Sequence, residues 1–190
     1  MALAITEAEK ARGSTGDNPW VGCVITDRAG AVVARGYTRG PGEDHAEIVA
    51  MHEAATRGVV LADTTLYSTL APCAFHGRTP ACVTAIVTSG VRRVVVGILD
   101  PNPRVDGKGL RILRDAGIAI VRDVCADAIT RQLASWLLRY HPHEPVRHAR
   151  KLVAAHGARA PDVVVHRLRA LYGIDVAAAE ALFARAARES

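Results

Sequence analysis

Residues 72–82 read Pro-Cys-Ala-Phe-His-Gly-Arg-Thr-Pro-Ala-Cys, a polar loop that two cysteines, Cys73 and Cys82, bracket. A second short motif, His45-Ala46-Glu47, lies upstream of this loop. Zinc binds imidazole nitrogen and thiolate sulfur, and a catalytic zinc site takes three protein ligands and keeps a fourth position for water. We therefore expect His45, Cys73 and Cys82 to hold a catalytic zinc ion, Zn2+.

Glu47 follows the expected histidine ligand by two residues, which suits a group that moves protons. Zinc lowers the pKa of its water. A nearby carboxylate can take that proton, pass it to a ring nitrogen and protonate a departing amine. One His and two Cys on the metal with a separate Glu form the donor set of zinc deaminases, so we expect a hydrolase with Glu47 as its catalytic acid and base. Two alternatives remain. Glu47 could be a charge at a helix N-terminus without a chemical role, or the zinc site could be structural with His76 as its fourth ligand.

The composition is that of a water-soluble globular protein. At 190 residues, with 49% hydrophobic and 23% charged side chains, the chain suits one domain with a short appendage. It shows no signal peptide and no long apolar span, so we expect a cytoplasmic protein and no membrane partner. Disulfides are rare in that compartment, which favours metal binding by the paired cysteines. Cys23 and Cys125 lie within apolar runs and are expected to be buried.

Hydrophobic periodicity and turn-forming residues predict strands that alternate with helices after an opening hairpin. Asp44 is the predicted N-cap of the helix that carries His45 and Glu47 in its first turn. The alternation predicts an α/β fold with a mixed sheet of about five strands, covered on both faces. The predicted strands are 21–27, 31–37, 64–70, 91–99 and 118–124, and the predicted helices are 1–12, 45–57, 80–89, 107–116 and 126–140.

The chain changes character after residue 140. His141-Pro142-His143-Glu144-Pro145 is a predicted break, and Gly157 and Gly173 divide the Ala- and Arg-rich remainder into three predicted helices. We therefore expect a catalytic domain over 1–140 and a helical C-terminal extension over 146–190. Its basic residues form a solvated helical face or a partner surface. A helix-turn-helix around Gly173 is an alternative, but no aromatic-rich basic groove is evident and we expect no nucleic-acid partner.

Five stretches share the pattern of one family. They are Asn18-Pro19-Trp20-Val21-Gly22-Cys23, residues 42–47, residues 67–82, Asp100-Pro101-Asn102-Pro103 and Gly107-Lys108-Gly109. Together they resemble the deaminase domain of the bifunctional riboflavin-pathway proteins of the RibD/RibG type, in the cytidine-deaminase-like superfamily, over residues 1–136. Cytidine, deoxycytidylate and tRNA-adenosine deaminases keep two residues between their cysteines, whereas eight separate Cys73 from Cys82.

The resemblance implies a three-layer α/β/α sandwich with bound zinc. It also implies a cyclic amidine deaminase (EC 3.5.4) that acts on 2,5-diamino-6-ribosylamino-4(3H)-pyrimidinone 5′-phosphate or a related phosphorylated aminopyrimidine. By the same likeness, Asn18 would hydrogen-bond the pyrimidine or ribose and Arg78 would face the phosphate. Asn102 would line the ribose-phosphate side, with His76 nearby. Arginine suits bidentate contact with phosphate.

Lys108 and Arg104 are further phosphate candidates and could equally be solvated charges. Two positions depart from the family's usual pattern: Ala71 stands in place of Glu and Phe75 in place of His, and both changes would alter the mouth of the pocket. The residues after Pro145 contain no Gly-x-Gly-x-x-Gly, so no reductase domain of the family is expected there.

We therefore expect a stand-alone deaminase of riboflavin biosynthesis or of a secondary-metabolite pathway that branches from it. A separate reductase would act on the product. The family likeness and the apolar tail predict a homo-oligomer, either a dimer or a tetramer. Two alternatives are a deaminase of another heterocycle, nucleoside or nucleotide, and a catalytically silent binding subunit that keeps the metal.

Overall fold

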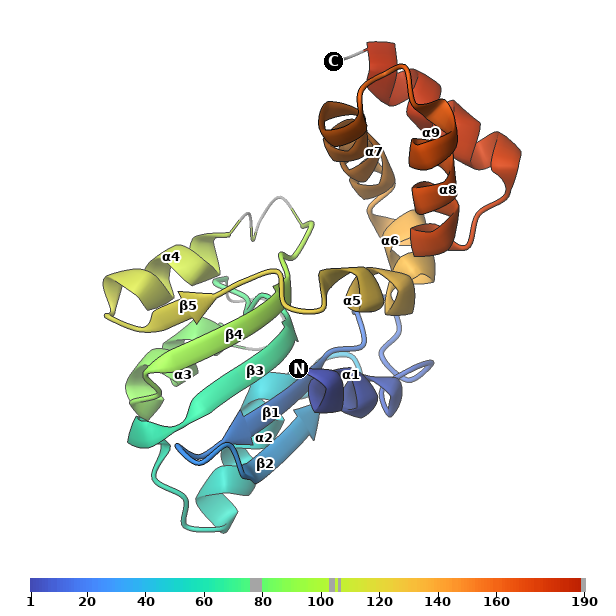
Figure 1. Ribbon diagram of the computed structural model, residues 1–190. Helices are drawn as coiled ribbons and strands as arrows, with labels where there is room; N and C mark the ends of the chain where they lie inside the picture. Colours follow the sequence, from blue (N-terminus) through green and yellow to red (C-terminus); the bar gives the residue numbers. More distant parts are fainter. Residues whose placement is uncertain (76–79, 103–104, 106, 189–190) are drawn as a thin grey trace. The chain divides into compact units, whose positions relative to one another are not determined.

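The computed structural model describes residues 1–75, 80–102, 105 and 107–188, in two compact units, Met1–Ile129 and Thr130–Ser190. The first unit contains a five-stranded mixed sheet in the order β2-β1-β3-β4-β5 (Figure 1). β1 runs antiparallel to β2 and β3, while β3, β4 and β5 are parallel, so the predicted hairpin and mixed sheet are confirmed. The strands are β1 (Gly22–Thr26), β2 (Val32–Tyr37), β3 (Thr65–Leu70), β4 (Arg93–Ile98) and β5 (Ala119–Val121).

Helices cover both faces of this sheet, and two glycines show how closely. A Cβ on Gly22 of β1 would lie 1.9 Å from the carbonyl oxygen of Ala4 in α1, and a Cβ on Gly36 of β2 would lie 2.3 Å from that of Ala46 in α2. Gly36 pairs with Cys23, the residue after Gly22, so the two glycines face opposite sides. The predicted α/β/α layering is thereby confirmed. The helices of this part are α1 (Ala2–Glu9), α2 (Ala46–Thr56), η1 (Leu61–Asp63), α3 (Cys82–Ser89), α4 (Lys108–Asp115) and α5 (Ala126–Gln132), which crosses into the second unit.

The strand register brings four connections to one edge of the sheet. The first residue of β1, Gly22, pairs with the last residue of β2, Tyr37, and Cys23 pairs with Ser68 near the end of β3. The last residues of β3 and β4, Leu70 and Ile98, are also partners. The residues before β1 and those after β2, β3 and β4 therefore all leave the sheet at this edge, where open α/β sheets bind their ligands.

Three predicted boundaries were wrong in detail. The N-cap of α2 is His45 and not Asp44, whose carboxylate lies 3.3 Å from the His52 Nδ1 instead. Helix α3 begins at Cys82 and not at residue 80, because Ala81 has extended backbone geometry, with φ −62° and ψ 126°. The predicted helix over 126–140 is divided at Leu133 into α5 and α6 (Ala134–Tyr140).

The predicted break over 141–145 is shorter than expected. Helix α7 (His143–His156) begins within it and includes Pro145 as its third residue. Proline is tolerated there because the first N–H groups of a helix have no intrahelical partner.

The second unit is a group of helices that pack on one another. α6 and α7 contact each other, and both contact α8 (Pro161–Tyr172), while α9 (Val176–Arg188) packs on α7 and α8. Gly157 and Gly173 follow α7 and α8 with positive φ, which confirms the three helices predicted after the break. The compact units divide between Ile129 and Thr130, so the domain boundary at residue 140 stays a prediction. Within the described ranges, no helix is both long enough and apolar enough to cross a bilayer.

The two cysteines outside the motif differ from each other. Cys23 lies in the middle layer of the first unit with 0% exposure, as predicted. Cys125 is exposed, so the prediction that it is buried was wrong. The predicted strand over 118–124 ends earlier, at Val121, and Cys125 has a φ of +60° in the turn that leads to α5.

Candidate metal centre

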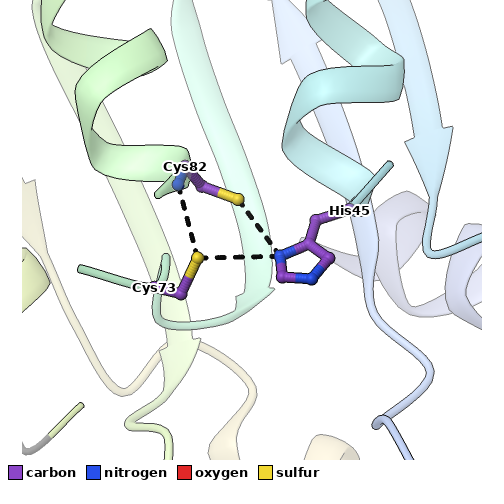
Figure 2. Close-up of side chains that lie close together, drawn as sticks. All are labelled: His45, Cys73 and Cys82. Carbon is purple, nitrogen blue, oxygen red and sulfur yellow. Dashed lines mark hydrogen bonds between the residues drawn. The ribbon is translucent and has the colours of Figure 1, made fainter. Parts of the chain in front are cut away.

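His45 is positioned by the start of α2. Its backbone is extended, with φ −73° and ψ 161°, while its carbonyl accepts the hydrogen bond from the N–H of Val49. This N-cap geometry turns the side chain away from the helix axis and toward the sheet edge described above. Figure 2 shows the imidazole extending from the end of α2 toward the two cysteines.

Cys73 and Cys82 are joined by the start of α3. The backbone N–H of Cys82 donates to the Cys73 Sγ at 3.3 Å, and the N–H of Val83 donates to the Cys73 carbonyl at 3.2 Å. The loop after β3 thus satisfies two helix N–H groups that would otherwise lack partners. The positive end of the α3 dipole also favours thiolate over thiol at both sulfurs.

The three side chains form a compact donor set. Their ligand atoms all lie within 4.8 Å of one another. The His45 Nδ1 is 3.2 Å from the Cys82 Sγ and 3.7 Å from the Cys73 Sγ (Figure 2). Tetrahedral zinc with ordinary Zn–S and Zn–N bonds would set nitrogen and sulfur about 3.5 Å apart. The arrangement therefore fits the geometry and donor chemistry of a zinc site with three protein ligands.

The thiols of Cys73 and Cys82 differ in the direction of their pKa shifts. The pKa of Cys73 falls to about 4, because Cys82 donates to its sulfur and His45 lies beside it. The same interaction, together with burial, raises the pKa of Cys82. Contact with the Cys73 sulfur also raises the pKa of His45. A thiolate already favoured at neutral pH is the form that binds a metal cation.

Glu47 lies in the first turn of α2 and is 3% exposed. Burial raises the pKa of its carboxyl group, because the charged form is disfavoured away from water. The hydroxyl of Ser68 in β3 lies 3.3 Å from the Glu47 Oε1. The sequence reasoning missed Ser68. The available signal was a polar residue at an inward position of a strand that is otherwise apolar on that face.

The remaining predicted site residues are placed only in part. Asn18 precedes β1 and Asn102 follows β4, so both lie in connections at the same sheet edge as Cys73. The Asn18 carbonyl accepts from the Thr15 hydroxyl, and the Asn102 N–H donates to Asp100. These contacts lie within their own turns, so the substrate roles of both residues stay predictions. Lys108 begins α4 and is exposed. His76, Arg78 and Arg104 lie outside the described residues.

The chain resembles known proteins over a large part of its length. Residues 1–98 match the family model described as the cytidine and deoxycytidylate deaminase zinc-binding region. The riboflavin biosynthesis protein RibD of Aquifex aeolicus is 39% identical over 155 residues, which is 80% of this chain and 42% of that protein. The diaminohydroxyphosphoribosylamino-pyrimidine deaminase of Buchnera aphidicola is 41% identical over 120 residues, which is 63% of this chain and 79% of that protein.

A solved structure with a related name is also similar to this chain. The Thermotoga maritima diaminohydroxyphosphoribosylaminopyrimidine deaminase/5-amino-6-(5-phosphoribosylamino)uracil reductase matches with a TM-score of 0.70 and 35% identity, over 76% of this chain and 40% of that one. The chain spans about two fifths of the length of the Aquifex relative and of the Thermotoga protein. The fold, the His-Cys-Cys donor set and the family match agree, and the chain belongs to the cytidine and deoxycytidylate deaminase family with its zinc-binding region.

Proposed function

We propose that this chain is a zinc-dependent hydrolase that deaminates a phosphorylated aminopyrimidine, with His45, Cys73 and Cys82 as metal ligands. The observation that carries the proposal is the convergence of these three donor atoms within 4.8 Å beside the buried carboxyl group of Glu47. When bound there, zinc supplies the Lewis acidity that makes water a nucleophile near neutral pH.

Glu47 is the proposed proton carrier. Its carboxylate takes a proton from the attacking water and delivers it to a ring nitrogen of the substrate, so the amino-bearing carbon becomes tetrahedral. A second proton then passes from the added hydroxyl group through Glu47 to the amine, and ammonia leaves as a carbonyl forms. Water and the amino heterocycle are consumed, and ammonia and the oxo heterocycle are produced. Burial of Glu47 supports this cycle because it raises the proton affinity of the carboxyl group.

The proposed substrate is diaminohydroxyphosphoribosylaminopyrimidine, because this is the compound in the name of the Buchnera relative and of the Thermotoga protein. Asn18 and Asn102 are the proposed substrate contacts within the described residues, with His76 and Arg78 from the cysteine loop. Support comes from the register, which brings the connections of Asn18, His45, Cys73 and Asn102 to one edge of the sheet.

Ammonia release tests the proposal directly. The zinc-loaded protein should release ammonia from the diaminopyrimidine phosphate faster than from cytosine, guanine or cytidine. If another heterocycle is preferred, the substrate assignment is wrong while the deaminase chemistry stands. If none releases ammonia, the protein is a metal-binding subunit without this activity.

Glu47→Gln tests the proton carrier. We expect a loss of kcat of about 10²- to 10⁴-fold, since the amide cannot accept the proton from water, with stoichiometric zinc retained. The matched control is Glu53→Gln, which makes the same change on the same helix at a residue that pairs with Arg57. It should keep full turnover. Equal activity of both variants would contradict the role of Glu47.

The reductase partner, the oligomeric state and the pathway are also proposals. A separate reductase that acts on the deaminated product is supported by the reductase named in the Thermotoga protein. A homo-oligomer in the cytoplasm stays a prediction, and light scattering that shows only monomer would count against it. The choice between riboflavin biosynthesis and a branch from it depends on the substrate that the ammonia assay identifies.

A further inference from the structure

Ser68 connects the proposed proton carrier to the loop that holds Cys73. Its side chain is 0% exposed, in the third strand of the sheet. The hydroxyl group lies 2.8 Å from the carbonyl oxygen of Leu70 and 3.3 Å from the Glu47 Oε1. Leu70 ends β3, and the chain runs from it directly into Ala71, Pro72 and Cys73.

The hydroxyl group has a single hydrogen, and both the Leu70 carbonyl oxygen and the Glu47 Oε1 lie within its reach. The contact with Glu47 matters because that carboxyl group is buried. A buried carboxyl group needs fixed polar partners, and a hydroxyl group can donate to a carboxylate or accept from a carboxylic acid. When the carboxyl group is ionised, the Ser68 hydroxyl group can donate to Oε1, so a hydrogen-bond donor is fixed beside that oxygen.

We propose that Ser68 is a positioning residue for Glu47. It holds Oε1 against the end of β3, so that the other carboxylate oxygen, Oε2, is the one that exchanges protons with water and substrate. This inference rests on the proposed role of Glu47 and extends it by naming the group that fixes the orientation of the carboxyl group.

Ser68→Ala is the test, measured on the zinc-loaded full chain with ammonia release. We expect kcat to fall about 10- to 100-fold, the cost typical of a misplaced catalytic group, while KM and zinc content stay as in the parent. Ser68→Thr keeps the hydroxyl group and should restore most of the lost kcat.

Thr69→Val is the matched control. Thr69 is the next residue of β3, is equally buried and accepts a hydrogen bond from the Gly22 N–H through its hydroxyl oxygen. It points to the opposite face of the sheet from Ser68. We expect Thr69→Val to lose thermal stability at least as much as Ser68→Ala but to keep its kcat, because it removes a buried hydroxyl group without touching Glu47.

The outcomes separate the two proposals. A Ser68→Ala enzyme with parental kcat, beside an inactive Glu47→Gln, would overturn the positioning role and leave the proton carrier intact. Full activity of Glu47→Gln would overturn the proposed mechanism itself. A Ser68→Ala enzyme that loses zinc, or one whose kcat falls no more than that of an equally destabilised Thr69→Val, would show a purely structural hydroxyl group. If Ser68→Thr does not fold, the comparison of Ser68→Ala with Thr69→Val decides.

Discussion

The four cysteines of this chain share a side chain but not an environment. Cys73 and Cys82 lie at the start of α3, where the helix dipole and each other's sulfur set their protonation. Cys23 is fully buried, and burial raises the pKa of its thiol well above the ordinary value. Cys125 is exposed in a turn. Because the thiolate is the reactive form, position alone should divide the four into three reactivity classes.

Counting reactive thiols checks this division. In the zinc-loaded protein only Cys125 should react promptly with an aromatic disulfide reagent, since a metal ligand and a buried thiol are both protected. Removal of zinc by a chelator should raise the count to three, and unfolding should raise it to all four. A chelator-independent count would mean that Cys73 and Cys82 do not hold the metal. Cys125→Ser, which should lower every count by one, is the control.

At the scale of helices and strands, the close approach of a helix backbone to a strand backbone determines how the layers pack. Gly22 has no side chain, and α1 lies directly on β1 because of this. The absence of a side chain at Gly36 likewise lets α2 lie directly on β2. Helix α2 has His45 as its N-cap and Glu47 in its first turn. The position of His45 in the metal centre therefore depends on Gly36, which is itself no donor.

Gly22→Ala should destabilise the fold by about 3 kcal/mol, because the added methyl group would meet backbone atoms that cannot move aside. It would lie 1.9 Å from the Ala4 carbonyl oxygen and 2.5 Å from the Ala8 nitrogen. Gly30→Ala, at the tip of the β1–β2 hairpin with φ +84° and no atom within 4 Å, should cost only about 1 kcal/mol of left-handed strain. Urea unfolding measures both, and equal losses would show that α1 can shift away from β1.

The junction of α6 and α7 should respond to pH. The His141 ring packs on Trp136 with centroids 4.4 Å apart, and burial, then the neighbouring His143, lower its pKa below the ordinary value of 6.5. Between the lowered value and 6.5 the unfolded chain binds more protons, so stability is fully present above 6.5 and is lost as the pH falls through the folded pKa. Thermal unfolding at pH 5 and 8 should show a smaller pH effect in His141→Gln than in the parent.

At the scale of the whole chain, the metal donors and the second unit are separate parts. All three donor residues lie in Met1–Ile129, and none lies in Thr130–Ser190. A ligand that binds only the folded state stabilises it in proportion to its excess over Kd. Zinc should therefore stabilise the first unit and leave the second unit as it is.

The two tryptophans make this measurable, because Trp20 lies in the first unit and Trp136 in the second. In Trp136→Phe, the fluorescence of Trp20 should report a melting temperature that falls by roughly 10 °C when a chelator removes zinc. In Trp20→Phe, the fluorescence of Trp136 should report no shift. An equal shift for both probes would mean that the two units unfold as one.

Much of the secondary structure of the first unit could be predicted from the sequence. Each strand and helix of the sheet was predicted to within a few residues, because hydrophobic period and turn residues are local signals. The grouping of His45, Cys73 and Cys82 was also accessible, since residues that can hold a metal occur in short motifs of fixed residue types. The predictions failed at caps and junctions, where His45 replaced Asp44 as N-cap and Leu133 divided a helix.

Pairing between strands that are far apart in sequence explains which features could be seen only in the folded structure. The antiparallel register of β1 and the parallel register of β4 bring four distant connections to one edge, and no local signal encodes a register. The contact between Ser68 in β3 and Glu47 in α2 is likewise a consequence of which strand lies beside which helix. The residue types of the chain thus specify the chemistry that is available, whereas packing between segments far apart in sequence decides which groups meet, because burial and hydrogen bonding depend on neighbours in space.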